Sequence, residues 1–217
     1  MNQIQCTQHL LDMKIARSTP LLLALATMVT AGITMAADPL ISNGSFEEQP
    51  AGTSVSADSS GSKDDRTTFT GWRIFSIGNP PAAEFSATLV PDASDGKAAM
   101  QLKVDDTGAA EMDHAMDREG TEVPVSPDVT YHISFDAARV SGDCQLILAV
   151  AEYDANRSFL DSQTAVTFEV PDSKYQTFEM DWKCKNPAAE KVGLAFRING
   201  VGAVNIDNVR ITVVPTN

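Results

Sequence analysis

Short runs of alternating apolar and polar residues dominate the sequence after about residue 40, and they constrain the fold more than any other feature. A side-chain period of two is typical of strands that bury one face, whereas the 3.6-residue period of amphipathic helices is nearly absent. The runs are separated by Gly, Pro, Asp, Asn and Ser, which favour turns. This pattern predicts an all-β fold: an antiparallel β-sandwich or jelly roll of about eleven strands.

The alternation also predicts which side chains form the core. In each of three clear runs, the apolar members fall on one face of the expected strand and the polar members on the other. The expected core members are Tyr131, Ile133, Phe135 and Ala137 in the first run, Phe178, Met180 and Trp182 in the second, and Val192, Leu194, Phe196 and Ile198 in the third, together with Trp72. The polar members would lie on the outside of a sheet.

The segments between the runs suggest how the strands are connected. "LISNGSF" is expected to be the first strand, and "VSADSSGSKDDRT" reads as a low-complexity loop. "RVSGDC" and "YDANRS" are interpreted as hairpin turns because of their Gly, Asp and Asn residues. "EVPVSPDVTY" carries two prolines and is expected to cross between strands or sheets. No internal repeat or linker is evident, so one domain is predicted.

The N-terminal segment has the order of a secretory signal peptide. Lys14 and Arg17 precede the apolar run "PLLLALATMVTAGI", and small residues follow before Asp38. Cleavage after Ala36 or Ala37 would remove residues 1–37 and leave a domain at 38–217. The protein is therefore predicted to be secreted or periplasmic, with no membrane span in the mature chain. An uncleaved N-terminal anchor is the alternative.

The charge of the chain is strongly acidic. The formal net charge is −13, and removal of residues 1–37 leaves 14 basic and 28 acidic residues. Such a surface would repel nucleic acid, and no basic stripe is evident. Neutral ligands and cations are compatible with it, and so is acidity that serves solubility alone.

Two cysteines remain after signal removal, Cys144 and Cys184. An even count in an oxidising compartment is compatible with a disulfide. Two buried thiols are the open alternative. A metal site built on this pair is not expected, because no His cluster joins them.

Several blocks of sequence resemble a known family. "LISNGSFEE", "GW" at residues 71–72, "YHISFDAARV", "YQTFEMDWK" and "VNIDNVRI" occur in the order found in carbohydrate-binding modules of families 4 and 9. These modules are a branch of the galactose-binding-like jelly rolls. The blocks span nearly the whole predicted mature chain, and the resemblance implies a glycan-binding domain.

The resemblance also implies a structural calcium ion between the two ends of the domain. Its ligands would be Glu47, or Glu48 in its place, and Asp207, with loop carbonyl groups and Asp64 or Asp65 completing the shell. A cation would then compensate the carboxylate of Asp207, which lies in a strand where Asp is unfavourable. The alternative is that Asp207 caps a bulge or accepts backbone hydrogen bonds.

Glycan recognition needs planar polar side chains for the hydroxyl groups and flat rings for stacking. The polar faces of the expected strands, with a ring at a strand end, supply the predicted ligand-binding residues: His132, Asp136, Tyr153, Glu179, Asp181, Arg197 and Asn199. In the family the ligand lies on a concave sheet face or in loops at its rim. Further candidates are Gln101 and the rings of Phe75 and Phe159. No Trp falls on a polar face, which argues against tight binding of long glycans.

Catalysis has little support in the sequence. No motif of a serine hydrolase, zinc protease, P-loop or dinucleotide site appears. "EMDHAMDRE" has metal-like letters, but we interpret it as a hydrated polar edge. The leading prediction is an exported, non-catalytic carbohydrate-binding domain. The alternatives are a surface structural or interaction protein with the same fold and, less favoured, a small jelly-roll hydrolase or lyase that uses Glu179 with Asp136 or Asp181.

Overall fold

A computed structural model describes residues 40–58, 68–77, 84–105, 108–114 and 123–215. The predicted signal peptide, Asp64 and Asp65 lie outside these residues. The side chain of Phe75 does too. Among the described residues, none belongs to a helix long and apolar enough to span a membrane.

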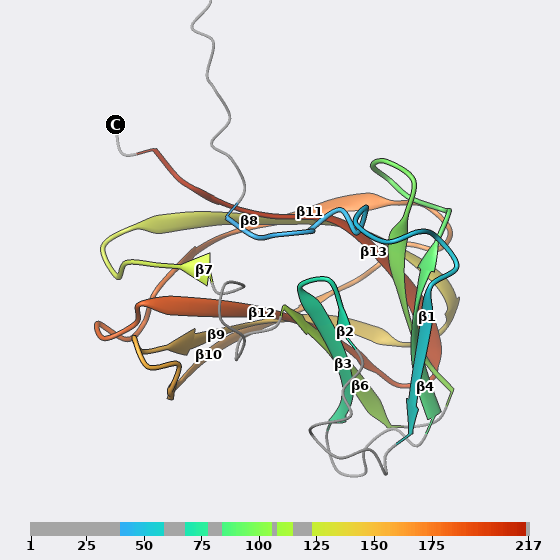
Figure 1. The fold of residues 1–217 in the computed structure, drawn as a ribbon, viewed down its shortest axis with the longest axis horizontal. Helices are drawn as coiled ribbons and strands as arrows, with labels where there is room; N and C mark the ends of the chain where they lie inside the picture. Colours follow the sequence, from blue (N-terminus) through green and yellow to red (C-terminus); the bar gives the residue numbers. More distant parts are fainter. Residues whose placement is uncertain (1–39, 59–67, 78–83, 106–107, 115–122, 216–217) are drawn as a thin grey trace, which may run out of the picture. The chain divides into compact units, whose positions relative to one another are not determined.

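Thirteen strands and no helix are assigned in the described residues, so the all-β prediction is confirmed (Figure 1). The strands are β1 (Ser54–Asp58), β2 (Thr68–Phe69), β3 (Trp72–Ile77), β4 (Glu84–Val90), β5 (Ala99–Val104), β6 (Ala109–His114), β7 (Val123–Pro124), β8 (Thr130–Gly142), β9 (Gln145–Tyr153), β10 (Phe159–Phe168), β11 (Gln176–Lys183), β12 (Lys191–Asn199) and β13 (Gly202–Val213).

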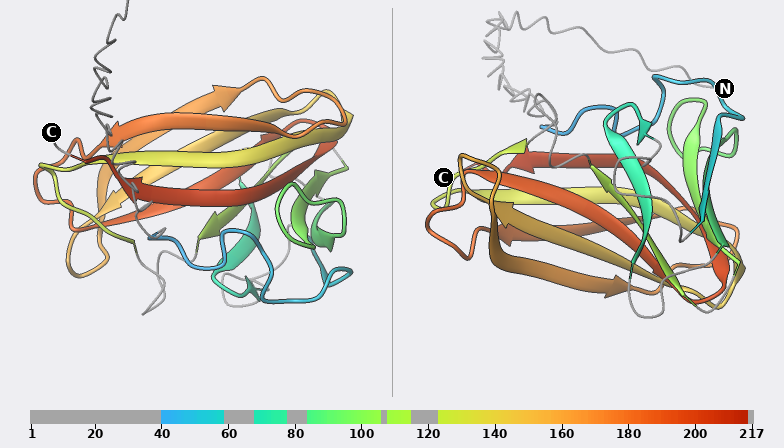
Figure 2. Two further views of the ribbon diagram at one scale, coloured as in Figure 1. Left: turned by 90° about the horizontal axis from the view of Figure 1, so that it is seen from above. Right: turned by 60° about the horizontal axis from the view of Figure 1, so that its bottom comes forward.

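The strands form two sheets. The six-stranded sheet has the order β1-β4-β5-β13-β8-β11, and the seven-stranded sheet has the order β10-β9-β12-β6-β3-β2, with β7 paired to β12. All pairings between these strands are antiparallel. Figures 1 and 2 show β8, β11 and β13 on one side of the sandwich and β9, β10 and β12 on the other. Neighbours in each sheet are mostly distant in sequence, as in a jelly roll.

The core lies between the two sheets and is rich in aromatic rings. The ring of Phe135 on β8 lies 5.0 Å from that of Phe196 on β12 and 5.1 Å from that of Phe168 on β10. Trp72 is fully buried and lies against Phe46 and Phe196. The predicted inward faces of β8 and β12 are confirmed, as is that of β11, where Phe178 and Met180 are half-buried and Trp182 is buried.

Two segments near the N-terminal side of the domain differ from expectation. "LISNGSF" forms turns, not a strand, and two of its residues, Asn43 and Phe46, have positive φ angles of 47° and 57°. It still lies against β13, because the Leu40 amide donates to the Ile211 carbonyl and Gly44 accepts from the Val209 amide. Conversely, β1 occupies the start of the predicted low-complexity loop. Turn-forming residues alone did not distinguish these cases.

"RVSGDC" is not a hairpin turn, because β8 and β9 belong to different sheets. Gly142 has a φ of 74°, and a Cβ there would lie 2.2 Å from the carbonyl oxygen of Val201, so the chain turns across the end of the sandwich through a glycine. The other two connections are confirmed. "YDANRS" closes the β9–β10 hairpin, where the Asp154 carboxylate accepts from the Asn156 and Ser158 amides. "EVPVSPDVTY" runs from β7 in one sheet to β8 in the other.

The interpretation of "EMDHAMDRE" as a hydrated polar edge is wrong for the residues that the structure describes. β6 lies between β12 and β3, and its Glu111, Asp113 and His114 are only 7%, 0% and 1% exposed. Neighbouring strands place Arg73 and Arg197 beside these two carboxylates. Alternation identifies the polar row of a strand, but it does not tell whether partner strands will cover and neutralise that row.

The two cysteines of the domain are free thiols. Cys144 is buried and Cys184 is half-buried, and no disulfide joins them. Burial raises the pKa of both thiols, to about 11 for Cys184. The structure therefore agrees with the alternative of two thiols.

We expect His114 to make stability depend on pH. Burial against Trp72 lowers its pKa to about 4 from 6.5. Above pH 6.5 the imidazole is neutral in both the folded and the unfolded state. Between pH 6.5 and 4 only the unfolded state binds the proton. The free energy of unfolding should therefore decrease as the pH is lowered through this range, by about 3 kcal/mol in total.

This pH dependence can be measured by urea unfolding at several pH values. The His114→Gln variant should lose that part of the slope, whereas a matched substitution of the more exposed histidine, His132→Gln, should not remove it. Equal slopes in the wild type and His114→Gln would contradict the assignment.

Candidate functional site

A buried carboxylate near the C-terminal end of the domain holds a loop to the six-stranded sheet. Asp207 on β13 is fully buried. Its Oδ2 accepts hydrogen bonds from the Ser94 amide (2.8 Å), the Ser94 hydroxyl (3.0 Å) and the Asp95 amide (2.9 Å). Burial raises the pKa of Asp207, and these donors act against that rise. The carboxylate thus satisfies backbone donors of the β4–β5 loop.

Asp207 also begins a bulge in its own strand. The pairing of β13 with β8 shifts register between Asp207 and Arg210, and Asn208 has a φ of 51°. The Asn208 amide donates to Asp207 Oδ1 at 2.7 Å. Asp207 therefore caps a bulge and accepts backbone hydrogen bonds, as the alternative to calcium binding predicted.

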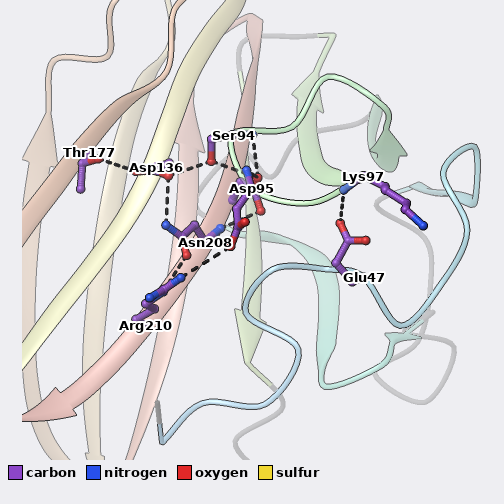
Figure 3. Close-up of polar contacts among 9 residues, drawn as sticks. Glu47, Ser94, Asp95, Lys97, Asp136, Thr177, Asn208 and Arg210 are labelled. Carbon is purple, nitrogen blue, oxygen red and sulfur yellow. Dashed lines mark hydrogen bonds and ion pairs between the residues drawn. The ribbon is translucent and has the colours of Figure 1, made fainter. Parts of the chain in front are cut away.

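Glu47 holds the same loop from its other side (Figure 3). Its Oε1 accepts hydrogen bonds from the Lys97 amide (2.6 Å) and the Ala98 amide (2.8 Å), which lower the pKa of Glu47. Gly96 allows this approach, because a Cβ there would lie only 2.5 Å from Glu47 Oε1. Residues 94–98, which we call the clasp loop, are therefore held by one carboxylate from the start of the domain and one from its end.

Asp136 belongs to this structural network. It lies opposite Asp207 on β8 and is buried. Its carboxylate accepts hydrogen bonds from the Ser94 hydroxyl (2.7 Å), the Thr177 hydroxyl (2.6 Å) and the Asn208 side-chain amide (3.1 Å). Figure 3 shows this network linking β8, β11 and β13 to the clasp loop. Asp136 is thus engaged in holding the clasp loop, and ligand binding by it stays a prediction.

The residues around the clasp loop offer only part of a calcium site. Among the described residues, no group of three or more His, Cys, Asp or Glu side chains could hold a metal ion. Glu47 Oε1 and both carboxylate oxygens of Asp207 already accept hydrogen bonds from backbone amides, so an ion would depend mainly on Glu47 Oε2 and on carbonyl groups. Arg210 brings a positive charge close by, 3.5 Å from Asp95. Calcium binding by Glu47 and Asp207 stays a prediction.

The seven predicted ligand-binding residues do not form one surface. His132, Asp136, Glu179 and Asp181 face outward from the six-stranded sheet, whereas Tyr153, Arg197 and Asn199 face outward from the seven-stranded sheet. Strand membership explains the split, because β8 and β11 pair with each other and β9 pairs with β12. The seven candidates are therefore divided between the two outer faces, and ligand binding by any of them stays a prediction.

On the six-stranded sheet, His132 is flanked by the two acidic side chains of β11. Its Nδ1 lies 2.9 Å from Asp181 Oδ1, and its Nε2 lies 3.8 Å from Glu179 Oε1. Both carboxylates are largely exposed. Exposed pairs of this kind contribute little to stability. Gln101 lies elsewhere on this face and donates to Asn205.

The outer face of the seven-stranded sheet has a different character, and we call it the small-residue face. Its middle consists of Ala149 and Ala151 on β9 beside Gly193 and Ala195 on β12. All four are buried.

Two ion pairs border the small-residue face on β6. Arg197 contacts Glu111 at 2.6 Å, and Arg73 contacts Asp113 at 2.6 and 2.8 Å. Burial raises the pKa of Glu111, and its hydrogen bond with Arg197 opposes this. Sequence reasoning proposed Arg197 but missed the other three residues. The alternation of charged and apolar residues in "RIF" and "EMD" indicated that Arg73, Glu111 and Asp113 share the polar side of their strands. The sequence did not show that β3, β6 and β12 are neighbours, which brings these charges together.

An aromatic pair lies at the opposite end of this face. The rings of Tyr153 and Phe159 lie 5.7 Å apart on the paired strands β9 and β10, and Phe159 is 50% exposed. Tyr153 pairs with Lys191, whereas Asn199 at the other end of β12 pairs with Gln145. Eight residues of extended strand separate Tyr153 from Gln145, a distance of about 26 Å.

Comparison with known proteins gives a fold but no close relative. No family model matches the chain, and no curated protein matches its sequence. Among solved structures, the Stig cyclase Fisc from Fischerella sp. TAU has a TM-score of 0.53 at 15% identity, over 82% of this chain and 97% of that one. A structure described as CBM4, a carbohydrate-binding module of family 4, has a TM-score of 0.50 at 16% identity, over 80% and 99%.

The tailspike protein 4 enzymatically active domain of bacteriophage CBA120 has a TM-score of 0.51 at 15% identity, over 81% of this chain. The chain spans about a fifth of that tailspike chain, 21%. In fold, the chain is thus similar to carbohydrate-binding modules of the jelly-roll class, as its sequence blocks predicted.

Removal of the Asp207 carboxylate should loosen the clasp loop. In Asp207→Ala, the Ser94 and Asp95 amides lose their acceptor, so the free energy of unfolding should fall by about 3 kcal/mol. Urea unfolding measures this change, and hydrogen exchange should show faster exchange at both amides. Asp128→Ala removes an exposed carboxylate and should change stability by less than about 0.5 kcal/mol. An Asp207→Ala protein as stable as the control would contradict the assignment.

The calcium prediction has its own test. If Glu47 and Asp207 bind calcium, the ion at 100 times its Kd should stabilise the fold by about 2.7 kcal/mol. Thermal unfolding with calcium and with a chelator measures this difference, which should vanish in Glu47→Gln. A melting temperature that is the same in both conditions, with Asp207→Ala still destabilised, would mean that hydrogen bonds alone hold the clasp loop.

Proposed function

We propose that the protein is an exported, non-catalytic glycan-binding domain, and that the small-residue face is its binding surface. The observation that carries the proposal is the arrangement on three adjacent strands: an aromatic pair at one end, with Phe159 exposed and Tyr153 half-buried, polar side chains at the other end, and a row of buried Ala and Gly residues between them. The similarity in fold to a family 4 carbohydrate-binding module supports the same class of ligand. Export rests on the signal-like order of residues 1–37.

The chemistry of this face suits a chain of sugar units. Phe159 and Tyr153 offer ring faces on which a pyranose can stack. Asn199 and Arg197 offer donors, and Asn199 also an acceptor, for hydroxyl groups. Arg197 keeps about a third of its side chain exposed although it pairs with Glu111. The aromatic and polar ends are about 26 Å apart, so a ligand that touches both is an oligosaccharide.

The carboxylates that the structure describes on the two outer faces favour binding over hydrolysis. Hydrolysis of a glycoside requires two carboxyl groups that face each other across the substrate. On the small-residue face, Glu111 and Asp113 are each held by an arginine. On the other sheet, Glu179 and Asp181 follow one another on the outer side of a single strand, and Asp136 is buried under the clasp loop. These arrangements support a binding role.

Glycan-array binding by the full chain tests the proposal. Phe159→Ala and Tyr153→Ala should each weaken binding of a positive oligosaccharide by about tenfold, because each removes a stacking ring. His132→Ala lies on the opposite sheet and should bind as the wild type does. An array without any bound glycan, from a folded protein, would contradict the proposal and favour a structural or interaction role. Release of shortened glycans would contradict the non-catalytic part.

A further inference from the structure

A polar pocket of about 450 Å³ opens at the end of the sandwich where three connections meet. We call it the end pocket. Its walls come from the β8–β9 turn, from the residues just after β10, and from the β12–β13 turn. Its volume lies within the range of roughly 300–1,000 Å³ that small-molecule sites occupy. Its lining is mainly polar, so a hydroxylated ligand fits it better than an apolar one.

Two primary amides form one side of the end pocket. Gln145 on β9 and Asn199 on β12 are partners in the sheet register, and both are exposed on its outer face. An amide both donates and accepts hydrogen bonds, as a sugar hydroxyl group does. Two amides side by side can therefore bind adjacent hydroxyl groups. Glu169, which follows β10, adds an acceptor, and the half-buried Phe168 adds an apolar surface.

The charges around the end pocket argue against an anionic ligand. Arg139 is the cation among its described lining residues, and its Nε lies 2.5 Å from Asp172 Oδ1. Its Nη1 lies 3.7 Å from Asp143 Oδ1. Two carboxylates therefore already surround this guanidinium, and Glu169 adds a further negative charge. A phosphate, sulfate or uronic acid would meet net repulsion there.

We propose that the end pocket binds a single neutral sugar unit, as a site distinct from the stacking end of the small-residue face. The two lie about 26 Å apart along β9, and Gln145 and Asn199 form the border between pocket and face. The inference rests on the proposed glycan-binding function, and it assigns the recognition of one sugar unit to this end of the sheet. The unit is either the terminal unit of a glycan on the face or a free monosaccharide.

The test uses the full chain and neutral monosaccharides, namely glucose, galactose, mannose, xylose and N-acetylglucosamine, with binding measured by ligand-observed NMR. The wild type should bind at least one of them. Gln145→Ala with Asn199→Ala should weaken that binding at least tenfold, and both side chains are exposed, so the fold should persist. His132→Ala, on the opposite sheet, should leave it unchanged. The same variants and Tyr153→Ala are then measured on an oligosaccharide that is positive on the array.

The outcomes separate the two proposals. Monosaccharide binding that only the double variant weakens supports the end pocket. In that case, a parallel loss of oligosaccharide binding identifies the terminal unit of a glycan as the ligand, and retained oligosaccharide binding identifies a free sugar. Oligosaccharide binding that depends on Tyr153 but not on Gln145 and Asn199, without monosaccharide binding, overturns the end pocket and leaves glycan binding at the stacking end of the small-residue face intact. No binding of any glycan or sugar overturns both.

Discussion

Buried carboxylates that find their hydrogen-bond donors on distant segments are the interaction on which this structure depends. Asp207 meets the clasp loop more than 100 residues earlier in the chain, at a sequence separation of 113 for Ser94. Glu111 meets Arg197 across the sheet, and Glu152 on β9 binds the Lys185 and Asn186 amides in the same way. A buried carboxylate without such partners is costly. Because each partner arrives only in one strand register, these acids favour the observed pairing of strands over shifted ones.

Local alternation predicted the inward faces well and the connections less well. The core members of β8, β11 and β12 follow from their period of two, because the side to which a side chain points is a local property of a strand. The turn at Gly142 was misread because its residues are those of a hairpin, and nothing local tells whether the next strand returns to the same sheet. The polar row of β6 was misread for a related reason: its neutralising arginines come from β3 and β12.

For the candidate site, too, the sequence predicted the local side of a strand on which a residue lies, but not which distant strands lie beside it. The sequence identified His132 and Arg197 as polar members of strands, and both are. It could not tell that they face away from the sandwich on opposite sides, because sheet membership depends on strand order. The resemblance in "NGSFEE" and "VNIDNVRI" predicted Glu47 and Asp207 as calcium ligands between the two ends of the domain. The structure shows both carboxylates holding the clasp loop through its backbone amides, and calcium binding by them stays a prediction.

The distribution of charged side chains between the two sheets shows how a strongly acidic chain can place matched charges on one face. The six-stranded sheet carries the clasp loop and the exposed acids of β11. On the small-residue face, Glu111 and Asp113 are matched by Arg197 and Arg73, so these four charges cancel. Desolvating a matched pair beneath a ligand costs less than desolvating a lone charge. A face of this kind can therefore contact uncharged hydroxyl groups, although the chain as a whole carries a net charge of −13.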